Sequence, residues 1–184
     1  MNYKLSNFKK IINEEGYDNK LYTLITNLYQ YMLEKEWIGA CHATVSALYV
    51  ILKEEGYSPE ICIGEVKKDN FIFDHSWLIL DKKIIDLAIS MTLIDGIPMN
   101  APVIFDIDVD TLTKNKMIYG VKGNGLDWQA LAVINSTFND YMDSFPFNKK
   151  GLWGVVEEIL RHDIDINILK EKYNNTKRKL INDK

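Results

Sequence analysis

The chain has 184 residues, of which 47% are hydrophobic and 26% charged, and it carries a formal charge of −4. This length suits a single globular domain with a sizeable core, and the acidic balance argues against nucleic acid as a partner. No apolar run approaches the roughly 18 residues of a membrane span, and the N-terminus lacks a signal-peptide pattern, so we expect a cytoplasmic protein that makes no membrane contact.

The first 36 residues are predicted to form two helices. Apolar side chains recur at helical spacing over residues 4–15 and again over 19–36. Gly16 fits the position just behind the first helix. We expect this N-terminal part, residues 1–36, to pack on the core of the domain.

A third helix is predicted for residues 41–55, with Gly56 behind its last turn. Its first residue is Cys41, and small residues surround the cysteine, among them Gly39 and Ala40. A helix lined by such small side chains can approach a sheet closely.

Three strands are predicted next, because the period of the apolar residues changes from helical to extended. They cover residues 60–66, 71–80 and 83–88, and only Asp81 and Lys82 separate the last two. Such short connections produce an antiparallel meander, which we expect to pack on the third helix.

The rest of the chain has weaker patterns. Residues 37–125 are expected to form the core of the domain, and residues 126–184 a helical part of the same domain. The predicted elements are a strand at 102–110, a strand that ends in a flexible loop within 116–125, helices at 127–142, 151–161 and 163–181, and a frayed tail at 174–184. His162 lies at a helix end, and we expect no functional role for it.

Cys41 is the candidate nucleophile, because the thiolate is the reactive form of cysteine and a helix N-terminus stabilises it. The free N–H groups of the same helical turn can hold the oxyanion of a tetrahedral intermediate. The alternative is a small thiol that only fills space against the sheet, which is what we expect of Cys62 in its apolar strand. Two cysteines do not make a disulfide framework, so both thiols should be free.

His75 and Asp86 are the candidate partners of the Cys41 thiol. An imidazole in FIFDHSWLIL and a carboxylate in IIDLA are both costly to bury unless they are paired. With a two-residue loop between the strands, Leu80 pairs with Lys83. His75 and Asp86 then lie on one face of the sheet as diagonal neighbours. These positions predict a Cys-His-Asp triad, and the alternatives are a core histidine bonded to a backbone carbonyl and an aspartate that ends an edge strand.

A cysteine at a helix start, a histidine in a strand and an aspartate in the next strand resemble the transglutaminase-like superfamily, the papain-related cysteine enzymes. The resemblance rests on GACHATVSALYVILKEEGY, IGEV, HSWL and IIDLA, within residues 37–90. Within this superfamily, the pattern is similar to the bacterial branch that includes proteases of lasso-peptide maturation. The resemblance implies a papain/transglutaminase-like core, with Cys41 as nucleophile, His75 as base and acid, and Asp86 as the residue that orients the imidazole.

Four further residues stand close to this set in the sequence. Trp37 and Trp77 are candidates for substrate binding or for the oxyanion hole. His42 and Asp74 could join a zinc site, but no CxxC or HExxH pattern accompanies them. We therefore expect no metal site, and we expect His42 to point away from the nucleophile.

The sequence thus predicts an α+β fold, with the cysteine-bearing helix on an antiparallel sheet and additional helices at both ends. The expected activity is acyl transfer from an amide through a thioester, most simply hydrolysis of a peptide or protein substrate by a peptidase or amidase without a cofactor. Two alternatives remain open, an amine acceptor as in transglutaminases and acyltransferases, and a non-catalytic member of the fold that binds a peptide or protein.

Overall fold

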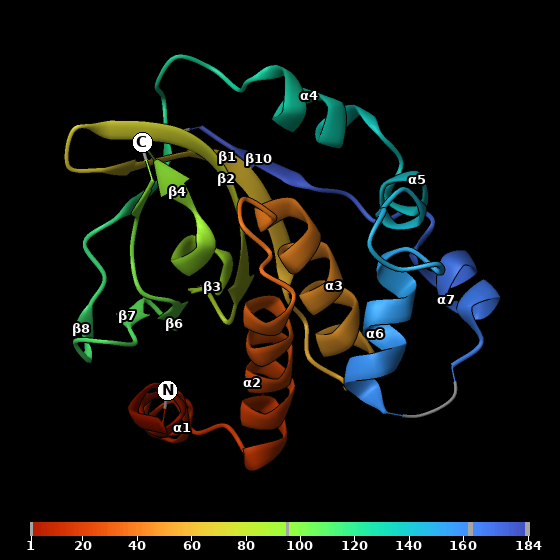
Figure 1. The fold of residues 1–184 in the computed structure, drawn as a ribbon, viewed down its shortest axis with the longest axis horizontal. Helices are drawn as coiled ribbons and strands as arrows, with labels where there is room; N and C mark the ends of the chain where they lie inside the picture. Colours follow the sequence, from red (N-terminus) through yellow and green to blue (C-terminus); the bar gives the residue numbers. More distant parts are fainter. Residues whose placement is uncertain (1, 95, 162–163, 183–184) are drawn as a thin grey trace.

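The computed structural model describes residues 2–94, 96–161 and 164–182 of the chain. Its helices are α1 (Asn2–Glu14), α2 (Asn19–Glu34), α3 (Cys41–Glu54), the 3-10 helix η1 (Ala88–Met91), α4 (Trp128–Asn135), α5 (Phe138–Asp143), α6 (Leu152–Leu160) and α7 (Ile166–Tyr173). Its strands are β1 (Glu60–Lys68), β2 (Phe71–Leu80), β3 (Lys83–Asp86), β4 (Leu93–Ile94), β5 (Ile97–Pro98), β6 (Val103–Ile104), β7 (Ile107–Asp108), β8 (Thr113–Lys114), β9 (Ile118–Val121) and β10 (Lys179–Ile181). The protein is therefore α+β, as the sequence predicts (Figure 1).

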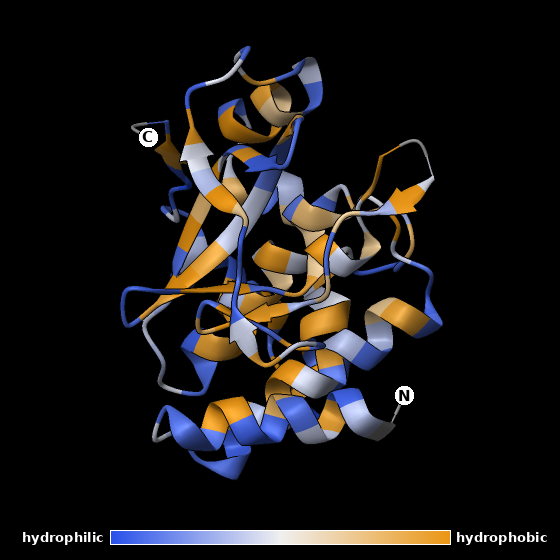
Figure 2. Cartoon of the chain, turned by 90° about the vertical axis from the view of Figure 1, so that its left-hand side faces the viewer, coloured by the Kyte–Doolittle hydropathy of each residue, from blue (hydrophilic) through white to orange (hydrophobic). Residues whose placement is uncertain are grey.

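The first three helices lie where the sequence predicts them. α2 begins behind Asp18, whose carboxylate accepts hydrogen bonds from the N–H groups of Lys20 and Leu21. Orange and blue alternate along the helix that begins at the N-terminus in Figure 2, as expected for a helix with one apolar face. Among the described residues, no helix combines the length and the apolar character that crossing a membrane requires.

The centre of the fold is an 8-stranded sheet with the strand order β10-β1-β2-β3-β6-β7-β8, in which β9 also pairs with β1. β1 pairs antiparallel with β2 and β9, and in parallel with β10. Helices α2, α3 and α6 pack against one another, and α3 lies on β1 and β2 (Figure 1). The helix that begins with Cys41 is thus packed directly on the long central hairpin.

The turn between β2 and β3 sets their register. Asp81 and Lys82 both have left-handed backbone conformations, with φ values of 49° and 66°, as in the type I′ turns that close two-residue hairpins. Leu80 therefore pairs with Lys83, so the predicted register is confirmed.

The pairing of β2 with β3 is short, and this shapes the site. The last paired residues are Leu78 and Ile85, after which the chain turns into η1. The part of β2 that carries His75 consequently has no strand of β3 beside it. Side chains alternate along β2, so Leu78 joins the core under α3 while Trp77 packs on the opposite face.

Two predicted elements in the middle of the chain are wrong in detail. The strand predicted for 102–110 is a hairpin, because Phe105 and Asp106 take left-handed conformations between β6 and β7. The helix predicted for 127–142 is divided into α4 and α5, because the Thr137 side chain caps a new helix by accepting a hydrogen bond from the N–H of Asp140.

The predicted C-terminal helix and the frayed tail are also wrong. α7 ends at Tyr173, and residues 179–181 form β10 beside β1. The outer edge of β1 offers unpaired backbone groups, and the tail satisfies them in spite of its polar sequence. The predicted helix end at His162 lies outside the described residues.

Candidate active site

Cys41 is the first residue of α3, and its side chain is 8% exposed. The approach to the helix is fixed by Gly39, which has a φ of 69° and donates its N–H to the carbonyl of Met91 at 3.0 Å. Ala40 makes no side-chain cap, so the first-turn N–H groups of α3 keep their hydrogen-bonding capacity. The thiol therefore lies at the positive end of a helix that is tied to the segment just behind Asp86.

His75 is fully buried, with 0% exposure. Its Nε2 lies 3.0 Å from Oδ1 and 2.9 Å from Oδ2 of Asp86, so the predicted pairing of the two side chains is confirmed. The other ring nitrogen, Nδ1, is buried and makes no hydrogen bond with the described part of the chain. Nδ1 is thus the nitrogen left for an exchange of protons with the thiol.

Asp86 is the last residue of β3, and its carboxylate is also buried. Besides His75, it accepts a hydrogen bond from the N–H of Ile89 at 3.1 Å and one from the hydroxyl of Tyr119 at 2.9 Å. Tyr119 comes from β9, and its ring packs against that of Trp77 with centroids 5.0 Å apart. The sequence analysis missed Tyr119, because the hydrogen-bond partner of a tyrosine in an apolar strand cannot be predicted from the sequence.

The charges of these groups stabilise one another. Burial raises the pKa of the Cys41 thiol, but the charges of His42 and His75 outweigh burial and lower that pKa to about 5. Burial lowers the pKa of His75, whereas the charges of Asp86 and Cys41 raise it to about 10. Between these two pH values the pair is therefore a thiolate and an imidazolium, the reactive form of such a pair.

His42 lies beside the thiol, so the prediction that it points away is wrong. Its Nδ1 is 2.7 Å from Oγ of Ser76, the residue that follows His75 on β2. The charge of His42 is also the larger of the two imidazole contributions that lower the pKa of Cys41. Two imidazoles, one from α3 and one from β2, thus flank a single sulfur.

Trp37 and Trp77 are both buried, with exposures of 4% and 1%. Trp37 packs edge-on against the rings of Tyr31 and Phe145, and Trp77 packs against Tyr119. Trp77 thus packs beside the tyrosine that binds Asp86, Trp37 belongs to the main core, and a role in substrate binding stays a prediction for both.

The pKa of the second cysteine, Cys62, is shifted in the opposite direction from that of Cys41. Cys62 is fully buried on β1, in the apolar cluster that includes Trp77, as the sequence predicts. Burial raises the pKa of its thiol to about 12. The described residues contain no group of three or more His, Cys, Asp and Glu side chains that could hold a metal ion.

A cavity of about 340 Å³ is lined by residues of β1, β10 and the segment 122–126, and by none of the residues around Cys41. Gly64, which lines it, is the direct cross-strand partner of His75. The loop at 122–126 lines part of the cavity. The carboxylate of Glu65 fixes this loop by accepting hydrogen bonds from three of its backbone N–H groups. Leu131, Leu180 and Ile181 contribute apolar side chains to the lining, so this cavity suits an apolar group of a bound molecule.

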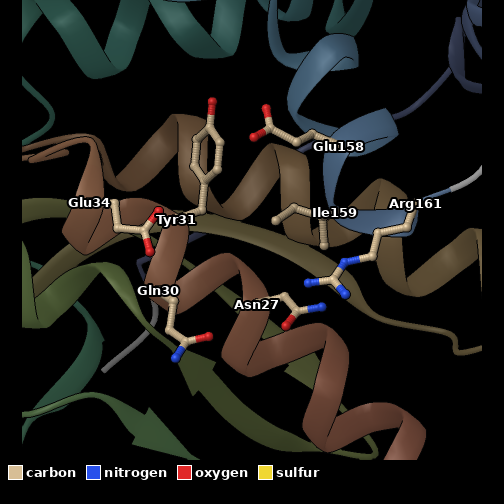
Figure 3. A pocket seen from close by; sticks show the side chains of 7 residues that line it. All are labelled: Asn27, Gln30, Tyr31, Glu34, Glu158, Ile159 and Arg161. Atoms are coloured by element: carbon tan, nitrogen blue, oxygen red, sulfur yellow. The ribbon is translucent and has the colours of Figure 1, made fainter.

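A separate cavity of about 300 Å³ lies between α2 and the end of α6. Figure 3 shows that Asn27 on α2 and Arg161 at the end of α6 face each other across it. Its lining residues include no strand partner of His75, so we do not assign it to the site around Cys41.

No family model, curated protein or solved structure matches the chain. The function of the protein has to be inferred from the geometry around Cys41.

Proposed function

We propose that the protein is a cysteine-dependent acyl-transfer enzyme that cleaves an amide through a thioester, most simply a peptidase or amidase. The observation that carries this proposal is the buried imidazole of His75, which is bonded to Asp86 through Nε2 and has Nδ1 free for the thiol of Cys41. We also propose that the α+β architecture is a papain/transglutaminase-like core, because the cysteine begins a helix and the other two residues stand on adjacent antiparallel strands.

The first half of the reaction uses the ion pair. The thiolate of Cys41 attacks the carbonyl carbon of the substrate, and the carbonyl electrons move to oxygen. The backbone N–H of Cys41 in the first turn of α3 is in place to donate to this oxyanion. When the intermediate collapses, the C–N bond breaks, the leaving amine takes a proton from the imidazolium of His75, and a thioester remains on Cys41.

The second half regenerates the thiolate of Cys41 and the imidazolium of His75. Water attacks the thioester carbonyl while neutral His75 accepts its proton, and the C–S bond then breaks to release a carboxylic acid. Asp86 stabilises each imidazolium form and fixes the ring so that Nδ1 is the nitrogen that exchanges protons. We propose water as the acceptor because it requires no second binding pocket.

The burial of the Cys41 thiol and the cavity beside β1 indicate which class of substrate could bind. Cys41 is buried, with 8% exposure of the residue, so its thiol is reached by a slender group rather than by a flat protein surface. The cavity of about 340 Å³ includes Gly64, the strand partner of His75, and we propose that it takes a large apolar side chain of the substrate. The proposed substrate is therefore a peptide or an extended segment of a protein.

The test compares wild type with Cys41→Ser and His75→Ala on a mixture of synthetic peptides, read by mass spectrometry. We expect cleavage products with wild type and none with either variant, and parallel incubation with hydroxylamine should give hydroxamates if an amine can replace water. A wild-type thiol that iodoacetamide alkylates no faster than glutathione near pH 7 would contradict the proposed enzyme activity and leave only the non-catalytic alternative.

A further inference from the structure

The side chain of His42 connects the start of α3 with β2. Its Nδ1 lies 2.7 Å from Oγ of Ser76, and Ser76 is 1% exposed. Cys41 and His75 are the chain neighbours of these two residues, so the His42 ring lies against the same small region of the molecule. Side chains alternate along β2, so the hydroxyl of Ser76 and the ring of His75 leave the strand on opposite faces.

The hydroxyl of Ser76 fixes the protonation pattern of the His42 ring. His42 Nδ1 is the hydrogen-bond partner that the structure gives to this hydroxyl, and a buried hydroxyl proton without an acceptor is costly. In the neutral ring the hydroxyl therefore donates to Nδ1, and the proton of the imidazole is on Nε2. In the charged ring Nε2 also carries a proton. Nε2 is thus a hydrogen-bond donor in both forms that keep this contact.

We propose that His42 donates its Nε2–H to the oxyanion that forms on the substrate carbonyl, and that Ser76 is the positioning residue that holds the ring in the donor form. This inference rests on the proposed acyl transfer at Cys41. The N–H groups of the first turn of α3 and the imidazole of His42 then stabilise the same negative oxygen from two sides.

Exposure supports this placement of His42. His75, Ser76 and Asp86 are buried to 1% exposure or less, and Cys41 is 8% exposed. His42 is half-buried, so of the two imidazoles beside the sulfur its ring is the one more accessible to a bound molecule. A donor at the entrance of the site is where the carbonyl oxygen of a bound amide needs one.

His42 could instead act on the thiolate alone, as a nearby positive charge. Two reagents separate these roles. Alkylation by iodoacetamide depends on the thiolate but forms no oxyanion, whereas acylation by p-nitrophenyl acetate passes through a tetrahedral oxyanion on the same sulfur. The ratio of the acylation rate to the alkylation rate at Cys41, measured by mass spectrometry at one pH, therefore reports oxyanion stabilisation.

We expect His42→Ala to lower this ratio on the order of 100-fold relative to wild type. His42→Gln, which places an amide donor near the position of Nε2, should restore most of it. Ser76→Ala should lower the ratio less than His42→Ala does, because the donor form of the ring is no longer enforced. If His42→Ala does not fold, as judged by circular dichroism, His42→Leu replaces it, because its volume is closer to that of histidine.

Equal losses of both rates in the folded His42 variants would overturn the inference, because the ring would then act only through the thiolate. That result would leave the proposed function intact. Failure of the proposed function is a different outcome, in which the wild-type thiol reacts with both reagents no faster than glutathione.

Discussion

Nε2 of His75 lies 2.9 Å from Oδ2 of Asp86, although the two residues stand on different strands, 11 positions apart. The type I′ turn at Asp81 and Lys82 sets the register that makes them diagonal neighbours on one face. A shift of one residue would move one of the two side chains to the other face of the sheet. The turn therefore determines whether this pair forms, and the behaviour of the Cys41 thiol depends on the pair.

The reactivity of Cys41 should depend on pH with a midpoint near its pKa of about 5, far below that of an ordinary thiol. The rate of alkylation by iodoacetamide is expected to rise through that pH and to stay level up to neutral pH, as measured by mass spectrometry of the cysteine peptides. Cys62 is the internal control, because its pKa of about 12 keeps it unreactive over the same range. Equal labelling of the two cysteines would contradict the assigned ion pair.

The stability of the fold should be nearly independent of pH between the ordinary pKa values of histidine and cysteine. Folding lowers the pKa of Cys41 from 9.0 to about 5, so its contribution is complete above pH 9.0 and is lost as the pH falls through 5. Folding raises the pKa of His75 from 6.5 to about 10, so its contribution is complete below pH 6.5 and is lost as the pH rises through 10. Between pH 6.5 and 9.0 the contribution of Cys41 increases with pH while that of His75 decreases, so the two changes cancel.

Cys41→Ala removes the contribution of Cys41 to the free energy of unfolding, which is the contribution that increases with pH. We expect its free energy of unfolding, measured by urea denaturation, to fall steadily as the pH rises above the ordinary histidine pKa of 6.5, whereas that of wild type stays level. Identical pH profiles for wild type and variant would show that the two groups do not ionise as a pair.

Asp86→Asn should separate the geometry of the pair from its charge. The amide is similar in shape, but it removes the negative charge that raises the pKa of His75. The imidazolium is then less stable, and we expect alkylation of Cys41 near neutral pH to fall about 10-fold or more. Asp81→Asn, in the exposed turn of the same hairpin, is the matched control and should leave the rate unchanged.

Tyr119→Phe should reduce stability because it removes one of the donors to the buried Asp86 carboxylate. A hydrogen bond to a charged group contributes about 1.5–3 kcal/mol, and we expect a loss of this size in the free energy of unfolding. Tyr57→Phe is the control, since its hydroxyl bonds to Asp18 on the surface at 3.2 Å and its removal should cost less than about 0.5 kcal/mol. Equal losses for the two variants would mean that the hydrogen bond to Asp86 contributes no more to the free energy of unfolding than a surface hydrogen bond does.

Gly64→Ala should detach the C-terminal strand. A Cβ at this position would lie 2.2 Å from the carbonyl oxygen of Ile181 and 3.3 Å from the ring of Trp77, so β10 has to move. We expect a loss of about 1–3 kcal/mol and faster hydrogen exchange at the amides of residues 179–181.

Gly16→Ala is the control for this substitution. Its φ of 82° strains any other residue, but no atom lies within 4 Å of the added Cβ. It should cost about 1 kcal/mol without any change in exchange at β10. Unchanged exchange in Gly64→Ala as well would argue against the pairing of β10 with β1.

Much of this arrangement follows from local patterns in the sequence. Helical spacing places α1, α2 and α3, with Cys41 at a helix start, and the two-residue turn at Asp81 and Lys82 puts His75 and Asp86 on one face. These features depend on residues that are close together in the chain, where side-chain period and turn chemistry act directly.

Tertiary structure alone decided the rest. The hydroxyl of Tyr119 on Asp86, the ring of His42 on Ser76 and the strand β10 beside β1 join segments that are far apart in the sequence. No period or spacing encodes such contacts, because each one is chosen by the packing of the whole domain around a buried polar group or an open strand edge that must find a partner.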